Sequence, residues 1–389
     1  MDEERSAQNA TRLSELTTMR VGGPVRTLLR PANRAELVEA VRTASAGNRD
    51  TDPWLVLGGG SNVLAPDEGL DATVILTGGV TGIESIAADD GRIHLRIAAG
   101  ERWDRVVAFC VDRGLAGVEA LSGIPGSAGA APVQNIGAYG QELASVLHAI
   151  EFHDTAADEL QRIPAHELGL GYRTSALKRG RDGVVIAVEL ALTPARVGVV
   201  GYEQLATALG VAVGSSAPLE RIREAVVELR RGKGMLEAGV VGSGGAAASG
   251  DSDDAPLPSC GSFFVNPIVD ENWARSLPAD APRWPVGREE ADLVASLEEG
   301  PRLRAYAERR DVKLSAAWLI ERSGIGRGFS LPGSRAAISP RHTLAIVNTG
   351  GASAREVVQL AEFVQLRVAQ EFGVTLRPEP VILTGEPVG

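Results

Sequence analysis

The stretch Val56-Leu-Gly-Gly-Gly-Ser-Asn-Val-Leu64 places a run of small residues directly behind a short apolar segment, Trp54–Leu57. That segment has the length of a buried strand, and a further strand candidate, Thr73–Leu76, follows it. Upstream, the strand candidate Val25–Arg30 leads into a helical stripe of apolar residues, Leu37, Val38, Val41 and Ala44. This order predicts a βαβ unit with a glycine-rich loop at the carboxyl end of a strand, where open α/β sheets bind ligands.

The loop Gly58–Asn62 matches neither standard nucleotide-binding signature. It lacks the third glycine of the Rossmann fingerprint, since Val63 stands in that place, and no Gly-Lys-Ser/Thr follows as in a P-loop. Its small residues still allow the backbone amides to converge on an anion. The loop is therefore either a phosphate site or a tight turn at the end of a strand.

A second loop covers residues 121–140, which show neither helical nor strand periodicity. Such a long stretch without regular structure in a compact domain is typical of a binding loop. Its small residues leave the backbone accessible to a flat or charged ligand: Ser122, Gly123, Gly126, Ser127, Ala128 and Gly129. Two such loops fit a long diphosphate cofactor, and purely structural turns are the alternative.

Composition excludes several classes of protein. The chain of 389 residues carries 39 basic and 50 acidic side chains, a formal net charge of −11, which argues against general binding to nucleic acids or anionic membranes. Two cysteines are too few for a disulfide framework, and the histidines lack the paired spacing of a catalytic metal site. The longest apolar run, Val184–Leu192, is too short to cross a membrane, and no signal peptide begins the chain. We therefore expect a cytoplasmic protein without a metal.

Further patterns divide the chain into three predicted domains, residues 1–76, 77–214 and 215–389. The second contains these predicted elements: strands at Ile93–Ile97, Ala149–His153 and Val184–Leu192, and a helix at Trp103–Arg113. The third begins with a helix from Pro218 to Arg231, and residues 241–258, rich in Gly, Ser and Ala, predict a flexible linker. Beyond the linker we expect strand Ser262–Val265, helix Ser315–Ser323, strand His342–Val347, a helix capped by Ser353 and Glu356 that ends before Gly373, and strand Val381–Thr384.

Five motifs stand in order along the chain: Val56-Leu-Gly-Gly-Gly-Ser-Asn-Val-Leu64, Ile124-Pro-Gly-Ser-Ala-Gly-Ala-Ala-Pro-Val-Gln-Asn-Ile-Gly-Ala-Tyr-Gly-Gln-Glu-Leu143, Gly171-Tyr-Arg-Thr-Ser-Ala-Leu-Lys178, Gly261-Ser-Phe-Phe-Val-Asn-Pro267 and Arg377-Pro-Glu-Pro380. Together they resemble the UDP-N-acetylenolpyruvoylglucosamine reductase (MurB) family from about Thr18 to Leu383.

The resemblance implies a mixed α+β or α/β chain, with a two-part FAD-binding domain of the vanillyl-alcohol-oxidase (PCMH) type and a C-terminal α/β domain that closes over the substrate. It also implies a reaction of peptidoglycan precursor synthesis. NADPH reduces FAD, hydride passes to the enolpyruvyl methylene of a UDP-sugar, and a proton adds to the neighbouring carbon to give UDP-N-acetylmuramate.

The resemblance assigns three catalytic residues. Arg173 matches the family arginine that pairs with the substrate carboxylate, a task that suits a planar guanidinium. Ser262 matches the proton donor, and Glu379 matches the glutamate that assists at the enolate, which requires a protonated carboxyl or a water molecule. Without the motifs, each of these residues has a purely structural interpretation. Arg173 would form a surface salt bridge, Ser262 would be a strand residue or a turn cap, and Glu379 would be an anion paired with a cation.

The same comparison implies residues that bind substrate and cofactor. Tyr202 stands where one subclass of the family carries a tyrosine that reaches the substrate diphosphate, and Tyr172, Lys233 and Asn266 match other substrate-binding positions. On residue grounds alone, Tyr202 is a partly buried residue at a helix start and Lys233 a solvated charge at a helix end. The implied FAD-binding residues are Gly58, Gly59, Gly60, Ser61, Asn62, Ser122, Gly123, Gly126, Ser127, Gly129, Gln134, Asn135 and Gly137. The implied ligands are the UDP-sugar and NADPH, bound by a monomer.

Two features depart from the family pattern. Cys260 stands where the family usually has alanine, and a thiol there is either sensitive to oxidation or buried and inert. The insertion at residues 241–250 lengthens the approach to the serine motif. Neither change removes a catalytic residue. The alternatives to a reductase are a flavin oxidase of the same fold, which reoxidises rapidly with oxygen, and an inactive binding protein; the set of Arg173, Ser262 and Glu379 favours the reductase.

Overall fold

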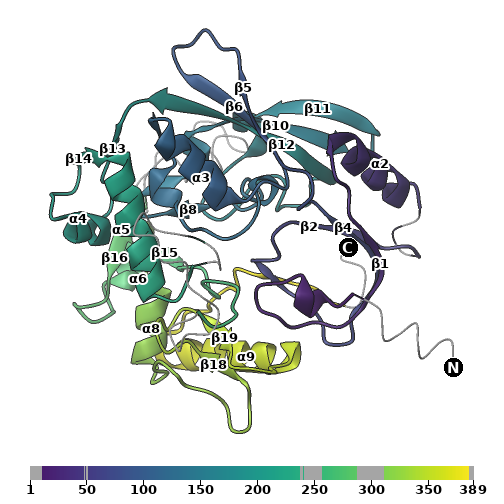
Figure 1. Cartoon of the computed structure of the whole chain (residues 1–389). Coiled ribbons are helices and arrows are strands. Elements are labelled where there is room, and N and C mark those ends of the chain that lie inside the picture. Colours follow the sequence, from purple (N-terminus) through teal and green to yellow (C-terminus); the bar gives the residue numbers. More distant parts are fainter. Residues whose placement is uncertain are drawn as a thin grey trace, which may run out of the picture. The chain divides into compact units, whose positions relative to one another are not determined.

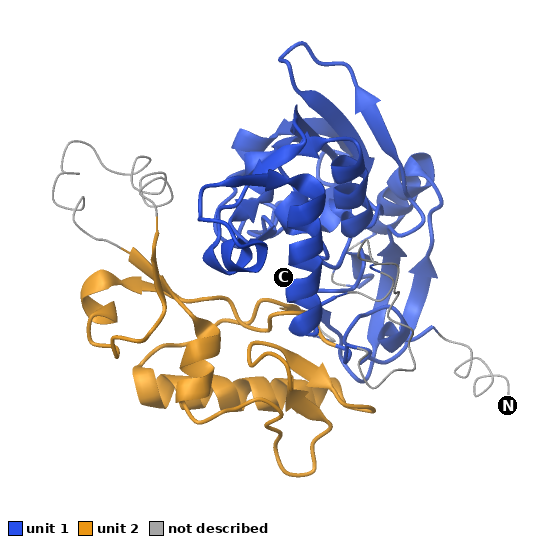
Figure 2. Ribbon diagram, turned by 60° about the vertical axis from the view of Figure 1, so that its left-hand side comes forward, with its two compact units in different colours: residues 1–258, 382–389 blue, residues 259–381 orange. Residues whose placement is uncertain are grey.

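A computed structural model of the chain describes these residues: 11–47, 49, 51–236, 240, 256–286 and 311–384. The chain folds into two compact units, which Figure 2 shows in different colours. Unit 1 comprises Met1–Pro258 together with Ile382–Gly389, and unit 2 comprises Ser259–Val381. The predicted linker, residues 241–258, lies largely outside the described residues.

A parallel sheet with a connecting helix forms the first part of unit 1 (Figure 1). Strand β4 (Leu70–Leu76) lies between β1 (Val25–Leu29) and β2 (Trp54–Leu57). Helix α2 (Arg34–Ser45) connects β1 to β2 and begins at Asn33, whose side chain accepts a hydrogen bond from the N–H of Glu36. These elements confirm the predicted βαβ unit, and the glycine-rich loop joins the carboxyl end of β2 to β3 (Val63–Leu64).

An antiparallel sheet forms the second part of unit 1. Its strands lie in the order β11 (Glu159–Pro164), β10 (Leu147–Asp154), β12 (Gly183–Pro194), β6 (Ile93–Ala98) and β5 (Ile83–Ile86), with β7 (Leu115–Ala116) paired to β12. All three strands predicted for this region are present. Strand β12 is buried over residues 184–192, because Val184 and Ile186 share a core with α2, whereas Val188 and Leu190 share one with α3 (Trp103–Asp112).

Residues 121–140 form short turns, as the missing periodicity predicted. The regular pieces in and beside this loop are the 3-10 turns η2 (Glu119–Leu121) and η3 (Ala128–Ala130) and the two-residue strands β8 (Gly137–Ala138) and β9 (Gln141–Glu142). The loop is fixed at its start by Trp103 of α3, whose ring N–H donates to the carbonyl of Leu121. It is therefore an ordered part of unit 1 without being a helix or a strand.

Helix α5 (Leu219–Gly232) also belongs to unit 1, beside α4 (Glu203–Leu209) and the hairpin of β13 (Val197–Val199) and β14 (Ser216–Pro218). Its buried residues Ile222 and Val226 pack with Tyr139 and Leu205. The contacts therefore divide the chain after Pro258, whereas the sequence placed the last boundary after residue 214. The difference arises because α5 packs against residues that are distant in the sequence. The apolar pattern of the helix itself does not identify those partners.

Unit 2 contains small antiparallel sheets and helices. In one sheet β17 (Asp311–Leu314) lies between β15 (Ile268–Asp270) and β16 (Arg283–Pro285); in another β18 (Ala336–Ile338) pairs with β19 (Ile346–Asn348). The helices among the described residues of this unit are α6 (Glu271–Ala274), α8 (Ala316–Arg322) and α9 (Ala354–Phe372). The predicted capping box of Ser353 and Glu356 opens α9, and Gly373 ends it. Among the helices that the structure describes, none combines the length and apolar character that a membrane crossing requires.

Three of the strands predicted beyond residue 258 differ in the structure. Residues 262–265 form an extended segment with one isolated bridge, Phe264 to Pro378, because the N–H groups of Phe263 and Val265 donate to different neighbouring segments. The strand predicted at His342–Val347 begins only at Ile346, because the N–H of Ala345 closes a turn onto the carbonyl of His342. The closing strand β20 (Val381–Ile382) is shorter than the predicted Val381–Thr384.

Candidate active site

The two glycine-rich loops of unit 1 lie against each other. The hydroxyl of Ser61 donates to the carbonyl of Pro125 (3.1 Å), and the amide of Asn62 donates to the side-chain oxygen of Gln134 (3.0 Å). A Cβ atom on Gly59 would lie 2.8 Å from the Cα of Gly126, closer than real Cβ contacts. The small residues are therefore needed for the approach of two backbones, which brings together loops that the sequence identified separately.

Gly60 has the strictest requirement in the first loop. Its φ of +61° is in the left-handed region, and a Cβ atom there would fall on the carbonyl oxygen of Leu16. We expect Gly60→Ala to lower the free energy of unfolding by more than about 3 kcal/mol, because backbone strain and a backbone clash add together. Urea unfolding measures this loss.

Gly210 provides a matched control. It has a similar φ of +69° at the end of α4, but a Cβ atom there meets no atom within 4 Å. Gly210→Ala should therefore cost only the conformational strain, about 1–2 kcal/mol. Equal losses in the two variants would show that the contact with Leu16 is unimportant.

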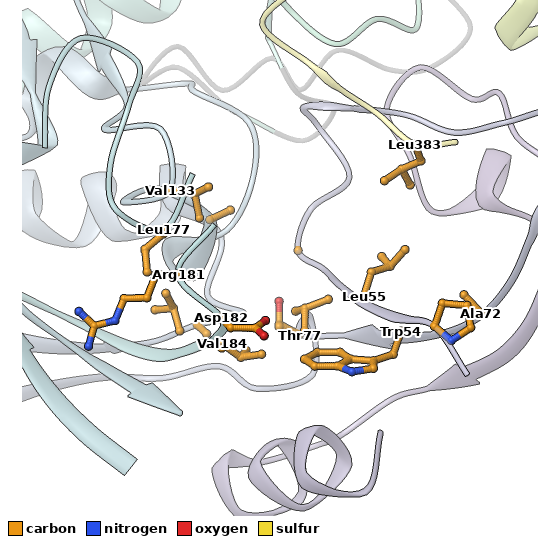
Figure 3. A pocket seen from close by; sticks show the side chains of 18 of the residues that line it. Trp54, Leu55, Ala72, Thr77, Val133, Leu177, Arg181, Asp182, Val184 and Leu383 are labelled. Atoms are coloured by element: carbon orange, nitrogen blue, oxygen red, sulfur yellow. The ribbon is translucent and has the colours of Figure 1, made fainter. Parts of the chain in front are cut away.

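A cavity of about 550 Å³ lies beside the loops (Figure 3). Gly58, Ser127 and Gly129 contribute to its wall from the two loops. Trp54 and Leu55 lie on one side of it, and Val133 and Leu177 lie on another. Its volume is within the range of roughly 300–1,000 Å³ that is usual for sites holding small molecules and cofactors.

Two buried polar groups in the cavity wall have no hydrogen-bond partner among the described residues. They are the ring N–H of Trp54 and the hydroxyl of Thr77, whose side chains belong to residues only 8% and 4% exposed. Both atoms have almost no accessible surface, so protein encloses them and neither offers a hydrogen bond into the cavity. The apolar walls and the loop backbone beside the cavity fit the flavin dinucleotide implied by the resemblance.

Several predicted cofactor residues have side chains that hold the loops together. Ser122 is fully buried and donates to the carbonyl of Glu119 (2.7 Å). The side chain of Asn135 is also engaged: its amide donates to the carbonyl of Gly171 (3.1 Å), and its oxygen accepts from the N–H of Ala144 (2.9 Å). Any contact of these two residues with a cofactor would therefore come from their backbone.

Arg173 lies against the second loop. Its guanidinium donates to the carbonyl of Gly137 (2.8 Å) and more weakly to that of Asn135 (3.4 Å), and it lies 5.6 Å from the ring centre of the half-buried Tyr172. Its own φ is +54°. The Gly-Tyr-Arg motif thus packs against the predicted cofactor loop, and these hydrogen bonds fix the position of the Arg173 guanidinium.

Tyr202 and Lys233 form a cluster with Tyr139. The rings of Tyr139 and Tyr202 meet edge to face with centres 5.9 Å apart, and the Lys233 ammonium lies 5.3 Å from the centre of the Tyr139 ring. The ammonium also donates to Gln204 (2.9 Å). Burial, followed by the charge of Arg230, lowers the pKa of Lys233. Lys233 is therefore half-buried and partnered rather than a freely solvated helix end.

Tyr139 was not identified from the sequence as a site residue. Its position within the long loop motif, between Ala138 and Gly140, was the available signal. The ring is 9% exposed and its pKa is raised by burial. Its contacts with both Tyr202 and Lys233 make it the residue that organises this cluster.

In unit 2 the structure brings Ser262 and Glu379 onto neighbouring segments. The N–H of Glu379 donates to the carbonyl of Phe263 (2.9 Å), one residue from Ser262. The rings of Phe263 and Phe264 are buried and meet edge to face, which anchors the serine segment. The segments that carry the two predicted catalytic residues are thus neighbours although they are far apart in the sequence.

Asn266 and Cys260 flank the serine segment. The side-chain oxygen of Asn266 accepts a hydrogen bond from the N–H of Ala316 at the start of α8 (2.9 Å). The predicted contact of Asn266 with the substrate would therefore be made by its side-chain amide nitrogen. Cys260 is buried, with 5% of its surface exposed. Within the described ranges, no group of three His, Cys, Asp or Glu side chains is arranged to hold a metal ion.

Comparisons with known proteins agree with this arrangement. Residues 25–163 match the family model of an FAD binding domain, and residues 252–383 match that of the UDP-N-acetylenolpyruvoylglucosamine reductase C-terminal domain. A UDP-N-acetylenolpyruvoylglucosamine reductase from Leifsonia xyli subsp. xyli is 52% identical over 95% of this chain and 97% of its own length. One from Nocardia farcinica is 42% identical over 97% of this chain and 89% of its own. The crystal structure of the reductase (MurB) from Thermus caldophilus matches with a TM-score of 0.58 and 26% identity, over 97% of this chain and 98% of that one.

Proposed function

Because the chain belongs to the UDP-N-acetylenolpyruvoylglucosamine reductase family, we propose that it reduces UDP-N-acetylglucosamine enolpyruvate to UDP-N-acetylmuramate with NADPH and a bound FAD, in peptidoglycan precursor synthesis. One observation carries this proposal: two glycine-rich loops meet beside a cavity, and both loops lie within the match to an FAD binding domain. FAD supplies the hydride transfer between the two substrates.

The chain's own residues bind and orient this cofactor. The backbone of Gly58–Asn62, with that of Gly126 and Ser127, supplies N–H groups for the diphosphate, a charge that converging amides bind well. The N–H groups of Ala128 and Gly129 instead donate to the carbonyls of Glu101 and Ala99. The apolar walls exclude water from the rest of the cofactor.

Three residues act on the enolpyruvyl group in this proposal. Hydride addition leaves negative charge on the carbon beside the substrate carboxylate, and the Arg173 guanidinium pairs with that carboxylate and stabilises the enolate. The Ser262 hydroxyl donates the proton that completes the product. Glu379 assists at the enolate as a protonated carboxyl or through a water molecule. The backbone contact between Phe263 and Glu379 supports the pairing of these last two roles.

Tyr202 and Lys233 bind the substrate diphosphate in this proposal, with Tyr172 and Asn266 as further contacts. The cluster that Tyr202 and Lys233 form with Tyr139 supports this assignment, since the Lys233 ammonium and the Tyr202 ring both lie against the Tyr139 ring. We also propose that the protein is a cytoplasmic monomer. Two free cysteines, Cys110 and Cys260, are consistent with a reducing compartment.

The purified protein tests the function directly. It should carry a visible flavin spectrum, and it should oxidise NADPH rapidly only when UDP-N-acetylglucosamine enolpyruvate is present. Rapid oxidation of NADPH with oxygen alone, unaffected by the UDP-sugar, would instead identify an oxidase of the same fold.

The environment of Lys233 predicts a pH dependence of substrate binding. A lowered pKa means that the ammonium loses its proton at a lower pH than an ordinary lysine. The positive charge, and with it the attraction for the diphosphate, is present below this pKa and is lost as the pH rises through it. We therefore expect the dissociation constant of the UDP-sugar to rise several-fold toward alkaline pH, starting below the usual lysine range.

Calorimetric titration of the oxidised enzyme across this pH range measures the effect. Lys233→Arg is the matched control, because a guanidinium keeps its charge throughout and should make binding nearly independent of pH. The same alkaline loss in both proteins would assign the pH dependence to another group.

A further inference from the structure

Gly123, at the start of the second loop, is held from both sides of its peptide backbone. Its N–H donates to a carboxylate oxygen of Asp104 on α3 (2.7 Å), and its carbonyl accepts from the Arg230 guanidinium on α5 (2.9 Å). Its φ is +68°, and a Cβ atom there would lie 2.7 Å from the side chain of Leu236. Two charged side chains from different helices therefore fix one residue of the predicted cofactor loop.

Asp104 is itself held by Arg223. The Arg223 guanidinium donates to both carboxylate oxygens, at 2.6 and 2.8 Å, and the two side chains are only 10% and 15% exposed. Burial by itself raises the pKa of Asp104, but the hydrogen bonds and charge of Arg223, with the N–H of Gly123, outweigh it and lower that pKa. Asp104 is therefore an ionised acceptor whose orientation is set by a planar, two-point contact.

The two arginines reach the loop from one face of α5. Arg223 and Arg230 are seven positions apart, which is two helical turns, so their side chains project from the same side. Arg230 also donates to the carbonyl of Met235 (3.0 Å), and its charge contributes to the lowered pKa of Lys233. Helix α5 thus connects the cofactor loop at Gly123 with the proposed substrate-binding lysine at its own end.

We propose that the Asp104–Arg223 pair is a positioning device, which fixes Gly123 so that the cofactor loop is already in its binding conformation before FAD arrives. This inference rests on the proposed function, because it takes residues 122–129 to face the cofactor. A buried ion pair is often no better for stability than apolar residues of similar volume, so stability alone does not account for this pair. A fixed loop instead lowers the entropic cost of binding.

The test separates positioning from stability. Arg223→Met leaves the Asp104 carboxylate buried without its cation, so this variant should lose both melting temperature and affinity for FAD. In Asp104→Asn/Arg223→Met the buried charge is gone and the asparagine oxygen can still accept from Gly123. This double variant should recover most of the melting temperature but bind FAD about tenfold more weakly, because the hydrogen bond to Gly123 becomes a neutral one and its acceptor is no longer oriented by Arg223.

Arg162→Met is the matched control. Arg162 donates through two nitrogens to the mostly buried Glu189 on the antiparallel sheet, and neither residue lines the cavity. Loss of the Arg162 guanidinium should affect the melting temperature without changing the affinity for FAD. The measurements are titration of flavin-free protein with FAD, and hydrogen–deuterium exchange of the peptide that contains Gly123, which needs no cofactor. Exchange there should be faster in both Arg223 variants and unchanged in the control.

Wild-type affinity and exchange in the double variant would overturn the positioning role and leave the pair as a stability contact only. The failure of the proposed function gives a different result, because then the flavin-free wild-type protein itself binds no FAD. Faster exchange with a tenfold loss of affinity at near-normal melting temperature supports the inference.

Discussion

In Ser262→Ala, reduction of the flavin by NADPH should proceed at nearly the wild-type rate, whereas reoxidation by the enolpyruvyl substrate should slow by about 10²–10⁴-fold. This range is typical for the loss of a general acid. Only the second half-reaction needs a proton at the carbon beside the carboxylate, so the two rates should separate. Stopped-flow absorbance follows both half-reactions in the visible flavin band.

Ser276→Ala is the control for this variant. Ser276 lies in the same unit, is exposed and donates to the carbonyl of Trp273 (2.7 Å), so its loss should leave both half-reactions unchanged. Equal slowing of flavin reduction and reoxidation in Ser262→Ala would indicate a damaged structure. Unchanged reoxidation would remove Ser262 from the role of proton donor.

Replacement of Arg173 should have the second large effect. In Arg173→Met we expect kcat/KM for the enolpyruvyl substrate to fall by about 10²–10³-fold, because a preorganised donor to the developing enolate is lost. Arg173→Lys should lie between this variant and the wild type, since an ammonium keeps the charge but not the two-point geometry. The rate of flavin reduction by NADPH should change little in either variant.

Arg173 also donates to the carbonyl of Gly137, so a loss of activity must be distinguished from a loss of loop structure. Melting temperature and FAD affinity of the same variants make this distinction. If Arg173→Met binds FAD normally and still reduces the enolpyruvyl substrate at the wild-type rate, the guanidinium plays no part in stabilising the enolate.

Local signals predicted much of the fold. The capping box of Ser353 and Glu356 and the glycine at residue 373 gave the limits of α9, because a helix end is determined by a few neighbouring residues. The strand and the glycine-rich loop at residues 54–62 were likewise predicted from neighbouring residues. By contrast, the position of α5 in unit 1 depends on Ile222 and Val226 meeting Tyr139, a contact between segments far apart in the sequence.

The candidate site divides in the same way. The motifs identified the two loops, but not that Ser61 and Asn62 bond directly to residues of the second loop. The small residues of the second loop included Gly123, but nothing in the sequence indicated the charged residues on α3 and α5 that hold it. Asp104 and Arg223 belong to no motif, and each reads by itself as an ordinary charge on a helix. Their relation exists only in three dimensions, and for that reason the sequence could not provide it.

One measurement tests the central claim most directly. Under anaerobic conditions the purified protein is reduced with one equivalent of NADPH, and UDP-N-acetylglucosamine enolpyruvate is then added while the visible flavin band is recorded. The account predicts that NADPH bleaches the band and that the UDP-sugar restores it, with formation of one equivalent of UDP-N-acetylmuramate. A band that stays bleached after the UDP-sugar and returns only when oxygen is admitted would contradict the account.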